Sequence, residues 1–159
     1  MRTFLYICYL LSSLYIANCS FQTSFFKEIN KQFVNKNLII SPLSAYQILS
    51  LAANGAKEKT LSEMVSALGG KSLEELNTIN LQILNEAKKF STVEIANAIM
   101  TKFVPDKNFL AIGQKYGASI QTLKGASQVN SWCNAKTHGK IKKIVDALPN
   151  EIKMIFLMS

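Results

Sequence analysis

The sequence predicts an α+β fold in which helices pack around part of a central β-sheet. Apolar residues recur at helical spacing along most of the chain. Two segments, 93–103 and 154–158, instead have the alternating or continuous apolar pattern of strands. The chain has 159 residues, 48% of them apolar and 18% charged. This composition excludes a disordered chain, and three cysteines are too few for a small disulfide scaffold.

The first nineteen residues have the pattern of a secretory signal peptide. Arg2 provides a positive start, and the uncharged apolar run at 4–16 is shorter than the roughly 18 to 20 residues that span a bilayer. The tripeptide at 17–19 resembles a cleavage site, so we expect residues 1–19 to be removed and Ser20 to become the N-terminus. A membrane anchor and a lipid-attachment site are the less favoured interpretations.

Removal of this leader would change the cysteine content and the charge. Cys8 and Cys19 would be lost, which leaves Cys133 alone and allows no internal disulfide. The one N-glycosylation sequon, at Asn18, would also be lost. The net charge would fall from +8 to +7, because Arg2 is the leader's only charged residue and the chain's only arginine. A lysine-only excess favours weak attraction to polyanions over specific nucleic-acid binding.

An amphipathic helix, a short strand and an apolar helix are predicted after the leader. Helical spacing predicts a helix over 21–34, and the β-branched run at 37–41 predicts a short buried strand. Ser41 has the position of an N-cap, with Pro42 as the first residue of a helix over 42–54. That helix has almost no polar face, so we expect it at the centre of a large core.

Capping boxes predict the next two helices. Thr60 with Glu63 precedes a helix over 61–68. A second box, which begins at Ser72, precedes a longer helix over 72–90.

The second half of the chain alternates strands and helices. The segment 93–103 has small or apolar residues on both faces, which indicates a mostly covered strand. A helix over 107–116 and a short strand over 119–123 follow. A helix over 127–137 ends at His138-Gly139, and its apolar side consists of Val129, Trp132 and Cys133.

The last apolar run is Met154–Met158. Five large apolar residues in succession predict a strand that is buried on both faces. Such a strand needs neighbours and covering elements. We therefore expect self-association through this strand if its edge stays open.

Residues with catalytic chemistry are few. His138 adjoins a helix-ending glycine and is expected at the surface, while Cys133 is expected to be buried and structural. No Cys/His spacing suits zinc, and no glycine-rich phosphate loop or nucleophile elbow occurs. We therefore expect no enzyme, no metal and no cofactor. Lys140, Lys142 and Lys143 could contact a polyanion weakly, although solvated loop lysines are the simpler interpretation.

Four motifs, in order along the chain, resemble the serpin family. Asn-Leu-Ile-Ile-Ser-Pro-Leu-Ser at 37–44 is similar to the family's strand-to-helix motif, and 54–61 to the turn and helix that follow it. Ile-Ala-Asn-Ala-Ile at 95–99 resembles the family's next strand. Val-Asn-Ser-Trp-Cys at 129–133, followed by Thr-His-Gly-Lys-Ile at 137–141, resembles a family signature on a helix.

This resemblance implies roles for particular residues. The shutter, where the family's main sheet opens, would include Asn37, Ser41, Pro42 and Ser44. The Trp132 helix would lie in front of that sheet, and the apolar helix behind it. The other structural positions of the family motifs are Gly55, Thr60, Asn97, Asn130, Trp132, Thr137, Gly139 and Lys140.

The resemblance also implies a function. Inhibitory serpins offer a reactive loop to a serine or cysteine endopeptidase, and the cleaved loop inserts into the main sheet as a strand. We expect residues 20–159 to be a partial serpin domain without that loop, and therefore secreted but non-inhibitory by itself. The alternative is a secreted, non-inhibitory interaction module that binds another polypeptide or a polyanion. Neither specific nucleic-acid binding nor membrane contact after leader removal is expected.

Overall fold

The computed structural model describes residues 19–34, 37–38, 40–91 and 93–158. The chain divides into two compact units, Met1–Asn80 and Leu81–Ser159, and each is described by itself. The leader predicted at 1–19 therefore lies almost entirely outside the described residues.

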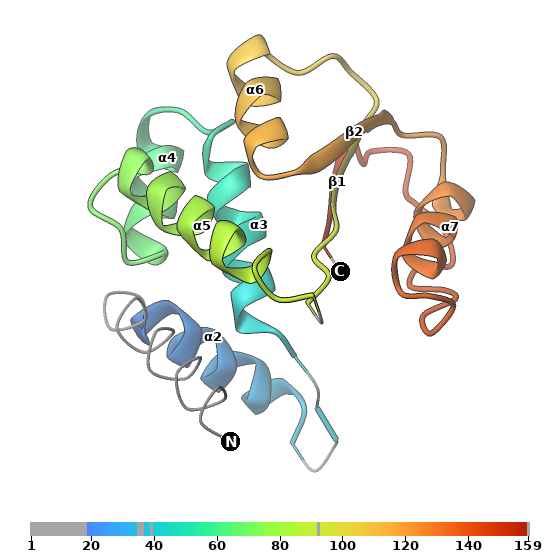
Figure 1. Ribbon diagram of the computed structural model, residues 1–159, viewed down its shortest axis with the longest axis horizontal. Helices are drawn as coiled ribbons and strands as arrows, with labels where there is room; N and C mark the ends of the chain where they lie inside the picture. The colour runs from blue at the N-terminus through green and yellow to red at the C-terminus, as the bar shows by residue number, and fades with distance from the viewer. Residues whose placement is uncertain (1–18, 35–36, 39, 92, 159) are drawn as a thin grey trace. The chain divides into compact units, whose positions relative to one another are not determined.

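The first unit is helical (Figure 1). It contains α2 (Cys19–Gln32), α3 (Pro42–Ala53), α4 (Glu58–Ala67) and the first half of α5 (Leu73–Ala87). All four helices were expected. The buried centre of the unit consists of Tyr46, Val65, Leu68 and Leu76.

Aromatic rings join α2 to α3. The ring of Phe21 stacks on that of Phe25 with centroids 5.7 Å apart, and lies 5.8 Å from the ring of Tyr46. Tyr46 is fully buried. Aromatic pairs at these separations contribute beyond simple burial of area. The amphipathic pattern of α2 therefore has the core contact that its helical spacing predicts.

The end of α3 is joined to the first half of α5 by two side-chain amides. Asn54 Nδ2 donates to Asn77 Oδ1 at 2.9 Å, and Asn77 Nδ2 donates to Asn54 Oδ1 at 2.8 Å. Both side chains are partly buried, so each amide compensates the other for lost contact with water.

Three expectations for this unit are wrong. The described residues of 37–41 form no strand, because this segment has no neighbouring strand to receive its backbone hydrogen bonds in the described sheet. Ile39 lies outside the described residues. The helix α3 is not buried on all sides, since Leu49 is 37% exposed. Thr60 does not cap α4, which begins at Glu58 after Lys57 and leaves Thr60 exposed within its first turn.

The cap of α5 was predicted correctly at Ser72. Ser72 Oγ accepts a hydrogen bond from the Glu75 N–H at 3.1 Å. The Glu75 carboxylate accepts from the Lys71 N–H at 2.6 Å, one residue earlier than in an ideal capping box. Two otherwise unpaired N–H groups at the start of the helix are thereby satisfied.

The second unit is a three-stranded sheet with helices on both faces. Its strands are β1 (Asn97–Thr101), β2 (Ala118–Thr122) and β3 (Met154–Met158), in the order β2-β1-β3. β1 is parallel to β2 and antiparallel to β3. The helices α6 (Lys107–Lys115) and α7 (Ala126–Lys136) lie on opposite sides of these strands (Figure 1).

The face toward α6 is built around one row of paired residues. Ile120 of β2, Ile99 of β1 and Phe156 of β3 are register partners. The Phe109 ring of α6 meets the Phe156 ring edge-on at 6.3 Å. A Cβ at Gly113 would lie 3.1 Å from Ile99 Cδ1, so this glycine lets α6 approach the sheet closely.

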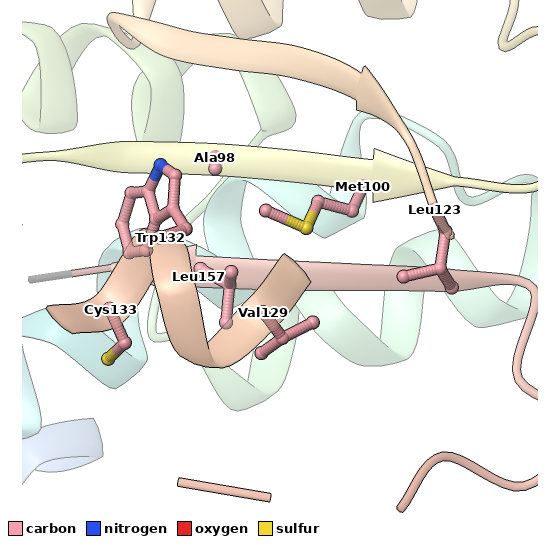
Figure 2. Packing of buried hydrophobic residues seen from close by; sticks show 7 residues of the cluster. All are labelled: Ala98, Met100, Leu123, Val129, Trp132, Cys133 and Leu157. Atoms are coloured by element: carbon pink, nitrogen blue, oxygen red, sulfur yellow. The ribbon is translucent and has the colours of Figure 1, made fainter. Parts of the chain in front are cut away.

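The opposite face is covered by α7. Figure 2 shows Val129 and Trp132 of α7 together with Met100 of β1 and Leu157 of β3. The full cluster consists of Ala98, Met100, Leu123, Val129, Trp132, Cys133 and Leu157. The predicted apolar side of this helix is therefore confirmed, and Cys133 is buried and free.

The expectation that β3 is buried on both faces is only partly right. Leu157 is buried, but the other four residues of the strand are half-buried. All five residues of β1, in contrast, are buried. The difference arises because β3 pairs with β1 on one side, whereas β1 has a neighbour on each side.

Replacement of Gly113 by valine tests the close contact between α6 and Ile99. We expect Gly113→Val to lower the free energy of unfolding by about 1–3 kcal/mol, because the added methyl groups overpack this contact. Ala111→Val is the control, since it adds the same type of side chain at an exposed position of the same helix. Urea unfolding measures both variants. Equal losses in the two would contradict the contact.

Candidate functional site

The outer edge of β3 has no neighbouring strand among the described residues. Lys102 N–H donates to Lys153 O at 2.8 Å. In an antiparallel ladder bonded pairs alternate, so the next bonded pairs are Met100–Ile155 and Ala98–Leu157. The backbone groups of the intervening residues Met154, Phe156 and Met158 consequently face outward. No strand of the described residues pairs with them.

The connection 137–153, between α7 and β3, is held to α7 by Asn130. The Asn130 Nδ2 group donates to Val145 O at 2.8 Å. Its Oδ1 accepts from the N–H groups of Ile144 at 2.9 Å and Val145 at 3.1 Å. One partly buried amide thus makes three backbone hydrogen bonds to a segment that has no regular structure of its own.

Thr137 and Gly139 make the turn that begins this connection. Thr137 Oγ1 donates to Cys133 O at 2.8 Å and accepts from the Ile141 N–H at 2.9 Å. His138 and Gly139 have φ angles of 51° and 80°, in the left-handed region that ends helices. The Gly139 N–H donates to Asn134 O at 2.8 Å. The predicted end of the helix at His138-Gly139 is confirmed.

Asn97 joins β1 to the turn before β2. Its Nδ2 donates to Tyr116 O at 2.7 Å, and the side chain is buried. Asn97 Oδ1 has no hydrogen-bond partner among the described residues. The bond to Tyr116 holds the end of α6 against the start of β1.

Gln128 caps the start of α7, a role that the sequence analysis did not identify. Its Oε1 accepts from the Lys124 N–H at 2.8 Å, and its Nε2 donates to Thr122 O at 3.0 Å. The signal that was available is an amide three residues after Gly125, the N-cap residue. Gln128 also connects α7 directly to the end of β2.

The residues expected in the shutter lie in the first unit. Ser41 Oγ accepts from the Ser44 N–H at 3.2 Å and from the Ser44 hydroxyl at 2.9 Å, which confirms the predicted N-cap of α3. Pro42 is the first helical residue. Asn37 is exposed, outside any helix or strand. The structure brings Ser41 and Ser44 together, and a role for them in sheet opening stays a prediction.

Gly55 and Lys140 have simpler surroundings. The Gly55 N–H donates to Ala52 O at 2.9 Å just after α3. Lys140 is exposed and directly follows the turn at Gly139. Lys142 and Lys143 are exposed as well, and Lys143 forms an ion pair with Asp146 at 2.5 Å. This pairing leaves less free positive charge than three neighbouring lysines suggest.

His138 has a partner that the sequence analysis missed. Its Nε2 lies 2.7 Å from Glu94 Oε2, and both side chains are largely exposed. Glu94 is 44 positions away in the chain, so no local pattern links the two residues.

The arrangement of strands and the α7 signature agree with one known family. The family model described as Serpin (serine protease inhibitor) matches residues 16–159. The chain belongs to the serpin family. The resemblance drawn from the four motifs is therefore confirmed.

Curated serpins show the same relationship. Serine protease inhibitor 42Dd of Drosophila melanogaster is 26% identical over 168 residues, which cover 94% of this chain and 45% of that protein. Leukocyte elastase inhibitor of Xenopus laevis is 30% identical over 137 residues, which cover 76% of this chain and 36% of that protein. The chain thus spans less than half the length of these relatives.

A solved structure confirms the predicted fold class. Native tengpin, a thermophilic serpin, is 33% identical with a TM-score of 0.79, and the match covers 92% of this chain and 40% of tengpin. The helices and the three-stranded sheet are therefore part of the serpin fold.

Loss of the Asn130 amide tests whether it holds the connection 137–153. We expect Asn130→Ala to destabilise the fold by about 2 kcal/mol, because three backbone groups lose their partner. Trypsin should then cleave the native protein faster after Lys142 and Lys143. Asn134→Ala, an exposed position one turn further along α7, is the matched control. Equal protection of the lysines in both variants would contradict the role of Asn130.

Proposed function

We propose that this chain is part of a secreted protease-inhibitor serpin and supplies one side of its main sheet. In this proposal residues 1–19 are the leader and 20–159 form a partial serpin domain. The open outer edge of β3 carries the proposal, because α7 covers one face of the strand while its outward backbone groups are left for a further strand. Family membership and the protease-inhibitor names of the relatives support it.

We further propose that the 159-residue polypeptide does not trap a protease by itself. Trapping needs a loop that a protease can cleave and that can then move into the sheet. Among the described residues, the long connection 137–153 is fastened by Asn130 and Thr137. Its far end is held by Lys102, whose Nζ donates to Asn150 O at 3.1 Å. A segment held at these points is poorly suited to being cleaved by a protease and then moving into the sheet.

The family's description as an inhibitor supports the further proposal that the chain is not an enzyme. Among the described residues, no helix is long and apolar enough to cross a membrane.

Incubation with proteases tests this proposal. The polypeptide collected from culture medium, with Ser20 as its N-terminal residue, should give no SDS-stable complex with trypsin, chymotrypsin, elastase or papain. Full-length leukocyte elastase inhibitor of Xenopus laevis with elastase serves as the positive control. A stable complex would overturn the proposal that this polypeptide does not trap a protease. A measured mass that still includes Met1 in the secreted polypeptide would overturn the predicted leader.

The second candidate function is an interaction module that pairs with a further strand, including one from another copy of the chain. The outward backbone groups of Met154, Phe156 and Met158 favour it, because unpaired strand edges recruit other strands. Weak polyanion contact at Lys140, Lys142 and Lys143 is the lesser part of this candidate, since Asp146 already pairs with Lys143.

Removal of one outward N–H group tests strand pairing at this edge. Met154→Pro removes a donor that faces away from β1, so the sheet should persist while self-association falls. Met154→Ala is the control, because it loses the same side chain but keeps the N–H group. Sedimentation velocity should show less oligomer for the proline variant only. Similar oligomer content in both variants would exclude this edge as the contact.

A further inference from the structure

A hollow of about 480 Å³ opens in the second unit, apart from the outer edge of β3. It is lined by the turn after α5, the approach to β1 and the last turn of α7. We propose that this hollow binds a small amphipathic anion, a molecule with an apolar body and one carboxylate or sulfonate group. Its volume lies in the range of small-molecule sites, about 300–1,000 Å³.

The charges around the hollow favour an anion. Lys88 and Lys136 both line it, and neither forms an ion pair with another described residue. Glu94, the acidic residue of the lining, lies 2.7 Å from His138, which also belongs to the lining. Glu94 therefore already has a hydrogen-bond partner, while neither lysine has an ion-pair partner in the described part of the chain. An ammonium group forms its strongest hydrogen bonds with ionised oxygens.

Lys89, the neighbour of Lys88, differs from it in its surroundings. It follows Lys88 directly in the chain but forms an ion pair with Glu86. Lys89 does not line the hollow.

The other part of the lining is apolar, which distinguishes the expected ligand from a polyanion. Val93 is 45% exposed and Ile95 is 37% exposed, so the lining offers aliphatic surface that a ligand could cover. Phe90 and Ala96, both half-buried, also line the hollow. A ligand with an apolar body would cover these side chains and place its charged group at the lysines. A highly charged polymer would leave the apolar surface in water.

Trp132 provides a way to observe binding. It is the only tryptophan of the chain. Ala135 and Lys136, which line the hollow, lie one turn after it on α7. Ala96 belongs to the lining and also packs against the cluster that contains Trp132. A fluorescent ligand in the hollow should therefore quench Trp132 by energy transfer.

The experiment compares two probes of nearly the same shape. The anion 8-anilinonaphthalene-1-sulfonate and the neutral N-phenyl-1-naphthylamine are titrated into the full chain, and quenching of Trp132 is recorded. Because charge-assisted hydrogen bonds contribute to only one of them, we expect the sulfonate to bind about tenfold more tightly. In the double variant Lys88→Gln/Lys136→Gln this advantage should be lost, while the affinity for the neutral probe should change less than about twofold.

The matched control is Lys107→Gln/Lys115→Gln, which removes the same charge from exposed lysines of α6 outside the hollow. It should leave both affinities within about twofold of those of the unchanged chain. Because partly folded proteins also bind the sulfonate, urea unfolding must show the same cooperative transition for all variants. If the lysine pair variant fails this check, Val93→Asp replaces it, and its added carboxylate should weaken the sulfonate selectively. Equal binding of the two probes, or an equal loss in the control, would overturn the proposal.

Discussion

The second unit depends on the two-sided pairing of β1. This strand is parallel to β2, antiparallel to β3 and buried along its whole length. Its alternate side chains reach two separate helical layers, with Ile99 toward α6 and Met100 toward α7. Since a buried strand must have its backbone groups paired, neither neighbour can be removed without cost. The two helices and the connection to β3 are arranged around this requirement.

Polar side chains extend this arrangement beyond the strands. Asn97 holds the turn before β2, Gln128 holds the start of α7 to the end of β2, and Asn130 holds the connection that leads to β3. Asn97 and Asn130 bond backbone groups outside regular structure, and Gln128 bonds both the last residue of β2 and Lys124 beyond it. These bonds explain how the long connection 137–153 is held along α7 although it contains no helix or strand. They also explain why that connection is a poor candidate for a mobile reactive loop.

The edge of β3 and the lysine-lined hollow are two different kinds of surface. The edge offers backbone groups, which any strand can pair with, so its specificity must come from side chains of the partner. The hollow has two lysines without an ion pair among the described residues beside exposed aliphatic side chains, and the proposed ligand accordingly has a charged group on an apolar body. A strand partner and a small anion can therefore be tested independently.

Features that depend on neighbouring residues could be predicted without the structure. The caps at Ser41 and Ser72, the buried side of α7 and the turn at His138-Gly139 follow from short-range hydrogen bonds and helical spacing. Which strands have neighbours depends on contacts between distant parts of the chain, so it became visible only in the folded molecule. The segment 37–41 has the composition of a strand but no partner in the described sheet, and β3 has one partner where its composition predicts burial on both faces. The contact of His138 with Glu94 and the hollow beside it join residues far apart in the chain, so no local pattern could have predicted them.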